Sequence, residues 1–261
     1  MKPLRYICLA AAAFAVVTLS SCIGDNSPTA ENVPTTAPVA ETQISSEAKD
    51  VGYMTKMSLM KGHLLVAKEL LDKNEPKQAE PHIGHPVEEI YGDVESQLKE
   101  RNVKEFKTTL DGLHDLVKSK PEDAKVATSF TSSMEAVDGA IAALPEEQRN
   151  KPEFVLTVIN RVLDTAKEEY EAAIANGKIV EDIEYQDSRG FVLYAQDLYA
   201  GISEQMKAAH PEEHKALTSN MSELVKAWPS VIPPSAPAKT PEEVATVVNT
   251  IEENAQKVIK T

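Results

Sequence analysis

The chain contains only two cysteines, and both lie within its first 22 residues. Cys8 falls inside an apolar stretch near the N-terminus, and Cys22 follows that stretch. The rest of the chain therefore has no disulfide, no thiolate metal site and no cysteine nucleophile. Burial of apolar side chains has to stabilise the fold instead.

Glycine and basic residues are also scarce. Ten glycines occur in 261 residues, and none forms a phosphate-binding loop or a G-x-S-x-G turn. Lysine and arginine number 27 against 41 acidic residues, which gives a net charge of −14. Such a charge opposes phosphate backbones and anionic lipids, so nucleic-acid binding is not expected.

The only long apolar run lies at the N-terminus. Lys2 and Arg5 precede an apolar run over residues 7–17, and the tetrapeptide Leu-Ser-Ser-Cys ends at Cys22. The run is shorter than the roughly 20 residues that a membrane helix needs, and the charged start is typical of a secretory signal. The tetrapeptide resembles the lipobox of bacterial lipoproteins, which are cleaved just before the cysteine.

That resemblance implies that residues 1–21 are a signal peptide and that Cys22 carries the lipid, palmitate included. The exported protein would then be anchored to a membrane of the bacterial cell envelope, in or facing the periplasm. Removal of Lys2 and Arg5 would change the net charge from −14 to −16. The alternative is an ordinary secreted protein with a chance cysteine near its cleavage site.

Composition divides the remainder into four parts. Residues 22–45 are rich in proline, threonine, serine and alanine without apolar periodicity, which predicts a disordered tether behind the acylated cysteine. A second proline-rich stretch, 229–241, predicts a linker. We expect a helical bundle over residues 46–228 and a separate C-terminal helix over 242–261.

Apolar residues recur at spacings of three and four throughout the expected bundle. This pattern is typical of helices with one apolar face, and almost no stretch alternates with period two. The sequence therefore predicts an all-α bundle of about seven or eight helices. The clearest sets are Tyr53, Met57, Met60, Leu64 and Leu71; Val87, Ile90, Tyr91, Val94 and Leu98; Phe154, Val158, Val162, Ala166 and Tyr170; and Phe191, Ala195, Leu198 and Ile202.

Two helical segments resemble each other. Residues 62–70 align with residues 190–198, and each segment precedes a His-Pro pair. A duplicated pair of bundle halves would produce this similarity. Chance similarity between amphipathic helices is the alternative.

Histidines and acids gather in the segment 80–89. His82 and His85 are followed by Glu88 and Glu89, and these side chains suit zinc, iron or copper. Alternatively, His85 lies just outside a helix that starts at the next residue, a proline, because the residue before proline avoids helical geometry. Glu88 would then simply favour the start of that helix.

Three further residues are candidates for the same site. His63 lies at the flank of an apolar stripe, and Gly62 beside it would let a neighbouring backbone approach closely. Glu184 and Asp187 project onto the apolar face of their helix, where an unpaired carboxylate is costly to bury. Each needs a partner: a metal, a hydrogen-bond donor or an arginine such as Arg161. A histidine held in the core and a buried ion pair are the alternatives.

The segment Gly84-His85-Pro86-Val87-Glu88 keeps a His-x-x-Glu spacing. It resembles the Gly-x-His-x-x-Glu motif of the imelysin-like periplasmic and lipoprotein family linked to iron uptake, although its glycine directly precedes the histidine. The resemblance implies a helical scaffold thought to be duplicated, with His85 and Glu88 as metal ligands.

The hypothesis is a lipid-anchored module that binds a divalent or ferric ion for capture, or for delivery to an envelope metal-transport component. One alternative is a structural or protein-interaction lipoprotein without metal, with apolar surface left uncovered around Trp228 or the last helix. Another is a metal-dependent hydrolase with Glu88 or Glu184 as general base. No organic cofactor is indicated.

Overall fold

The computed structural model describes residues 39–260, with side chains from residue 46 onward. The expected signal peptide, Cys22 and most of the expected tether lie outside the described residues. The described part is all-α apart from one short hairpin, as the periodicity predicted. Its α-helices are α1 (Val39–Asp72), α2 (Pro76–His85), α3 (Gly92–Glu100), α4 (Lys107–Ser119), α5 (Lys125–Ala142), α6 (Glu146–Arg149), α7 (Pro152–Ala172), α8 (Asp182–Ala209), α9 (Pro211–Leu224) and α10 (Pro241–Ile259).

A small hairpin connects α7 to α8. Strand β1 (Ile174–Ala175) pairs antiparallel with β2 (Lys178–Ile179). Asn176 and Gly177 between them have φ of 53° and 69°, which only an Asn-Gly type of turn adopts at little cost. The hairpin lets α8 fold back against α7.

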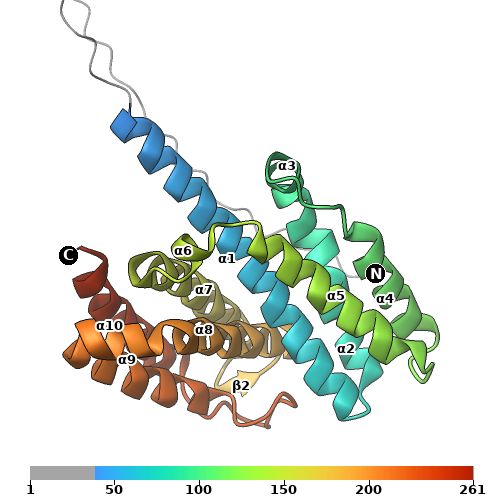
Figure 1. Cartoon of the computed structure of the whole chain (residues 1–261). Helices are drawn as coiled ribbons and strands as arrows, with labels where there is room; N and C mark the ends of the chain where they lie inside the picture. The colour runs from blue at the N-terminus through green and yellow to red at the C-terminus, as the bar shows by residue number, and fades with distance from the viewer. Residues whose placement is uncertain (1–38, 261) are drawn as a thin grey trace, which may run out of the picture. The chain divides into compact units, whose positions relative to one another are not determined.

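Helix α1 lies between two groups of helices (Figure 1). It packs against α2 and α5 in the first half of the chain, and against α7 and α8 in the second. Helix α10 packs against α7 and α9, and α9 packs against α8. Apolar faces from both groups therefore share the core that surrounds α1.

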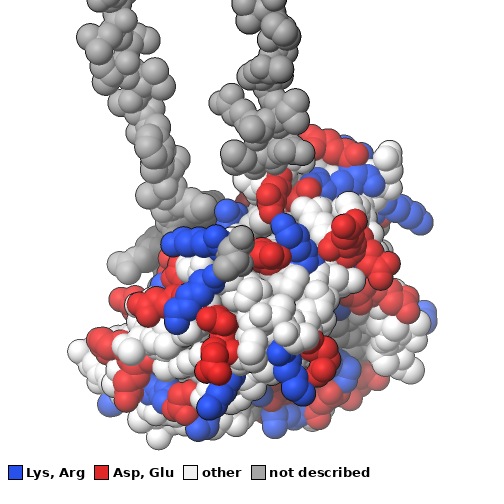
Figure 2. Space-filling model, turned by 60° about the vertical axis from the view of Figure 1, so that its left-hand side comes forward, with Lys and Arg blue, Asp and Glu red and all other residues white. Residues whose placement is uncertain are grey.

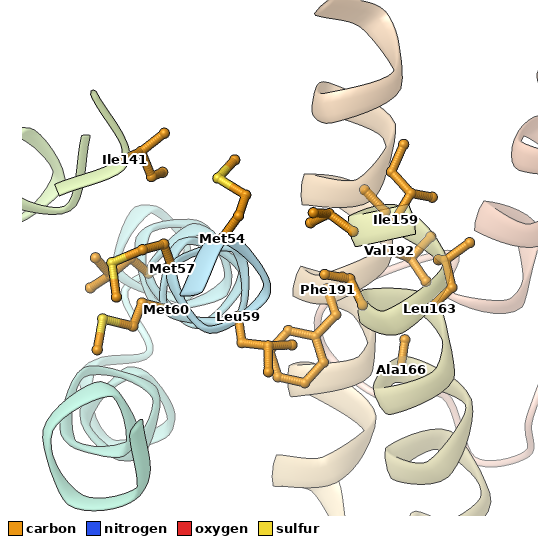
Figure 3. Packing of buried hydrophobic residues seen from close by; sticks show 14 of the residues in the cluster. Met54, Met57, Leu59, Met60, Ile141, Ile159, Leu163, Ala166, Phe191 and Val192 are labelled. Atoms are coloured by element: carbon orange, nitrogen blue, oxygen red, sulfur yellow. The ribbon is translucent and has the colours of Figure 1, made fainter. Parts of the chain in front are cut away.

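Side chains from α1, α7 and α8 interlock in that core (Figure 3). Phe191 of α8 lies towards Leu59 of α1, and Val192 lies on the side of Leu163 of α7. All four are buried. Full burial of each such side chain contributes about 1.5–3 kcal/mol to the free energy of folding.

Two glycines allow α1 and α8 to approach very closely. A Cβ atom at Gly190 would overlap the carbonyl oxygen of Gly62 and lie 2.7 Å from Cγ2 of Val66. A Cβ atom at Gly62 would lie 2.6 Å from the ring of Phe191. The close approach expected at Gly62 is confirmed, and it joins the two segments that resemble each other in sequence.

The helix that carries His82 and His85 does not break at Pro86. Helix α2 runs into a π-helix, η1 (Pro86–Tyr91), which continues into α3. His85 has helical angles of φ −52° and ψ −42°, so the expectation that it flanks a helix start was wrong. A π-turn widens the backbone and omits the hydrogen bond that proline cannot donate, and such turns are frequent at functional sites.

The ends of the bundle also differ from simple expectation. Helix α1 begins at Val39, before the boundary expected at residue 46. Trp228 closes a 3₁₀ turn, η2 (Val225–Ala227), and is only 2% exposed. Helix α10 packs on the bundle as well, and its apolar stripe is buried. Neither Trp228 nor the last helix is therefore left uncovered, as the alternative of a purely interacting protein had expected.

The surface carries charges of both signs. Acidic and basic side chains are interspersed over the face seen in Figure 2. Between residues 39 and 260, no helix combines the length and the hydrophobicity that crossing a membrane requires.

Candidate metal centre

Three imidazoles converge on one carboxylate. Oδ1 of Asp187 lies 2.6 Å from Nδ1 of His63 and 2.6 Å from Nδ1 of His82. Oδ2 of Asp187 lies 3.1 Å from Nδ1 of His85. One ligand atom from each of these four residues lies within 4.8 Å of all the others.

The fold supplies these side chains from three helices. His63 comes from α1, His82 and His85 lie three residues apart on α2, and Asp187 comes from α8. The glycine crossing sets the distance between His63 and Asp187, because each stands within one turn of its glycine. The Phe191 ring lies edge-on to the His63 ring at 4.9 Å and holds it in place.

The cluster is buried except on one side. His63, His82 and Asp187 are at most 4% exposed. His85 is only partly buried, with 18% of its side chain exposed. An ion would therefore reach the centre past His85.

The charges of the cluster are strongly coupled. Burial alone would raise the pKa of Asp187, but the neighbouring charge of His63 and hydrogen bonds from the imidazoles hold that pKa well below its usual value. Burial would lower the pKa of His85, but Asp187, with Glu89 and Glu88 at longer range, raises it to about 9. The cluster therefore keeps a carboxylate ionised in the core and binds protons at neutral pH.

The other expected site acids lie outside this set. Glu88 and Glu89 are exposed, and they act on His85 through their charge. Glu184 is half-buried, and its pKa is raised by burial and by the charges of Glu181 and Asp187. The structure thus brings four of the seven expected ligands together and leaves these three around them.

Asp187 forms no ion pair with Arg161 or with Arg189. Arg161 is exposed. Arg189 points away from the cluster, where its Nε donates to Glu69 at 2.9 Å and its Nη1 donates to the carbonyl oxygen of Trp228 at 2.7 Å. Of the partners expected for the buried Asp187, only imidazoles are present among the described residues.

Sequence reasoning missed two residues beside the cluster. Burial raises the pKa of Glu169 on α7 to about 7, and the charges of Asp187, Glu184 and Glu89 add to the rise. Gln186 accepts a hydrogen bond from Nε2 of His82 at 2.9 Å. Glu169 lies three residues after Ala166 of the apolar stripe of α7, so the spacing of this stripe could have predicted that Glu169 is partly buried. Nothing in the sequence pairs Gln186 with His82.

The donor set fits a transition-metal ion. Imidazole nitrogen and carboxylate oxygen bind such ions at about 2.0–2.2 Å, which places ligand atoms about 3–4 Å apart. The four ligand atoms lie within 4.8 Å of one another, so small side-chain movements would bring them to that spacing. Three imidazoles with one carboxylate suit zinc, copper and iron better than magnesium or calcium, which prefer oxygen ligands.

One of the comparisons with known proteins found a family similar to part of this chain. No curated protein and no solved structure matches the chain significantly. The three histidines precede residue 145, and Asp187 follows it. Residues 145–261, which include α7 to α10, match the model of the iron permease-associated 4-helix bundle domain family, and this part of the chain is therefore similar to a family associated with iron uptake.

Proposed function

We propose that this protein binds an iron ion through His63, His82, His85 and Asp187, and delivers it to a transport component of the cell envelope. Iron is here the cargo of the protein. The single observation that carries the proposal is the convergence of three Nδ1 atoms on one buried carboxylate. The similarity of residues 145–261 to an iron permease-associated domain favours iron over zinc or copper.

The electrostatics of the site support a cationic cargo. Asp187, Glu169 and Glu184 form no ion pair with lysine or arginine among the described residues. A buried carboxylate such as Asp187 is costly to keep ionised without a cation, and protonated imidazoles take that role in the metal-free protein. An iron ion would replace their protons, and the acids around His85 would attract the ion towards the exposed side of the centre.

The lipobox supports an anchored location. We infer that acylation at Cys22 holds the bundle close to a membrane, with residues 22–38 as the tether. Mass spectrometry of the N-terminal peptide from a membrane fraction tests this. A Cys22 that carries acyl chains is expected, and an unmodified cysteine inside an uncleaved N-terminus would contradict it.

Removing two imidazoles at once should abolish metal binding. We expect that His82→Ala with His85→Ala removes the heat of Fe²⁺ binding in anaerobic calorimetry, because only His63 and Asp187 remain. The matched control is His210→Ala with His214→Ala, two histidines at the junction of α8 and α9. Equal heats in the site variant and the wild type would contradict the proposal.

Metal binding should strengthen as the pH rises. His85 has a pKa of about 9, so it holds a proton at pH 7 that a metal ion has to displace. Each displaced proton changes the apparent affinity by about tenfold per pH unit below that pKa. Competition titrations with Zn²⁺ at pH 6.5 and 7.5 should therefore differ by at least about tenfold. An affinity that is the same at both values would show that His85 is not a ligand.

A further inference from the structure

A directed chain of hydrogen bonds leads away from the candidate centre through His82. Nε2 of His82 lies 2.9 Å from Oε1 of Gln186. Nε2 of Gln186 donates to Oε1 of Gln78 at 2.9 Å, and Nε2 of Gln78 donates to Oε2 of Glu75 at 3.1 Å. We call these four residues the relay.

Two acceptors that cannot donate fix the direction of the relay. The amide nitrogen of Gln186 also lies 3.2 Å from the carbonyl oxygen of Val231, and a carbonyl oxygen only accepts. The Glu75 carboxylate at the far end only accepts as well. The amide of Gln186 therefore turns its oxygen towards His82, and Nε2 of His82 has to carry a proton.

The Val231 carbonyl is itself held firmly. The residues Trp228 to Val231, which we call the strap, lie along the turn of α8 that carries Asp187. Tyr185 donates to the Ser230 carbonyl oxygen at 3.1 Å, and Nε1 of Trp228 donates to Oγ of Ser188 at 2.8 Å. The Val231 side chain is fully buried against α1 and α2. The strap thus keeps the Gln186 amide in one orientation.

We propose that Gln186 is a positioning residue that keeps a proton on Nε2 of His82, so that Nδ1, which donates to Asp187 in the metal-free protein, is the atom that gives up its proton and ligates a metal ion. This inference rests on the proposed function for the identity of the ligand, a transition-metal ion. When a metal ion displaces the proton that Nδ1 donates to Asp187, the Nδ1 lone pair binds the ion, and the hydrogen bond from Nε2 to Gln186 makes Nδ1 a stronger ligand. The strap holds the Gln186 amide through Val231, which is not a ligand, so the orientation of this amide does not depend on a bound ion.

The proton on Nε2 of His82 is testable without any metal. In metal-free protein at pH 7, two-bond proton–nitrogen correlation spectra of labelled histidine should show a protonated Nε2 in His82. An unprotonated Nε2 would overturn the assignment. If Nε2 is protonated but the wild type binds no metal, the assignment of this proton stands and the proposed function fails.

The positioning role is testable by substitution. Gln186→Leu removes the acceptor, whereas Gln186→Glu keeps an oxygen for His82 and removes the two amide hydrogen bonds. We expect Gln186→Leu to weaken Co²⁺ binding by about 10–100-fold and to shift the visible spectrum of the bound ion. Gln186→Glu should stay within about threefold of the wild type, because its carboxylate still accepts from Nε2.

A second glutamine on the same helix gives the control. Gln196 donates to the carbonyl oxygen of Met221 at 3.2 Å, outside the cluster. Gln196→Leu should leave both Co²⁺ affinity and spectrum unchanged. Equal losses in Gln186→Leu and Gln186→Glu would mean that the amide only anchors the strap, and this would overturn the positioning role. So would a Gln186→Leu variant with the affinity and spectrum of the wild type.

Discussion

Asp187→Asn is expected to weaken metal binding by about 100-fold or more. The carboxylate is the only anionic ligand of the four-residue cluster, and loss of even an outer partner of a metal ligand typically costs 10–100-fold. Asparagine keeps the shape of the side chain, so the loss reports on charge and not on packing. Calorimetry with Fe²⁺ or Zn²⁺ at pH 7.5 measures the change.

The same substitution should destabilise the metal-free protein. The pKa of Asp187 lies well below its usual 3.8, so its contribution is present above pH 3.8 and is lost as the pH falls further. The pKa of His85 is raised from 6.5 to about 9, so its contribution is complete below pH 6.5 and is lost as the pH rises through 9. Between these limits, removal of one partner of a buried pair costs about 3 kcal/mol or more.

Urea unfolding in the presence of a chelator at pH 5.5 measures this cost. Asp197→Asn on the same helix is the control, since Asp197 lies outside the cluster of ligand atoms. It should change neither metal affinity nor stability by a comparable amount. A free energy of unfolding for Asp187→Asn within about 0.5 kcal/mol of the wild type would contradict the charge coupling described for the cluster.

Gly190→Ala is expected to lower the free energy of unfolding by about 3 kcal/mol. The added methyl would overlap a backbone carbonyl oxygen, that of Gly62, which cannot rotate away as a side chain would. Overpacking costs about 1–3 kcal/mol, and the backbone contact puts this case at the upper end. Because α1 and α8 would separate, His63 would move away from Asp187, and metal affinity should fall as well.

Gly201→Ala supplies the matched control. Gly201 lies on the same helix, and an added methyl there would meet open space, so alanine should be neutral or should stabilise by about 0.5–1 kcal/mol through helix propensity. Thermal or urea unfolding of both variants checks the pair. Equal stabilities in the two variants would show that the helices do not cross as closely as Gly62 and Gly190 indicate.

Several parts of this arrangement were predictable from sequence. The spacing of apolar residues predicted the helices, and the placement of Asp187 on an apolar face indicated a buried carboxylate in need of a partner. Gly62 beside His63 indicated a close helix contact. These predictions succeed because burial and close packing leave a local pattern in the chain.

Other parts depend on distant contacts that no local pattern records. The proline rule predicted a helix boundary at Pro86, but a π-turn absorbed the proline and kept His82 and His85 on one helix. The bond from Gln186 to Val231 joins a helix to a proline-rich segment 45 residues later. The pKa of Glu169 is raised by burial and also by the charges of acids from two other helices.

The candidate centre joins two halves of the chain. The carboxylate lies in the part that is similar to the iron permease-associated domain, and the imidazoles lie in the part before it. A metal ion bound between them would link α1 and α2 to α8, so binding should stabilise the whole bundle. Saturation at about 100 times the dissociation constant would add about 2.7 kcal/mol.

The most direct test is anomalous X-ray diffraction at the iron absorption edge, from crystals of the purified protein grown anaerobically with Fe²⁺. We predict one strong peak about 2 Å from each Nδ1 of His63, His82 and His85 and from the Asp187 carboxylate. A peak elsewhere in the molecule, or no peak at full occupancy of the added iron, would contradict iron binding by this cluster.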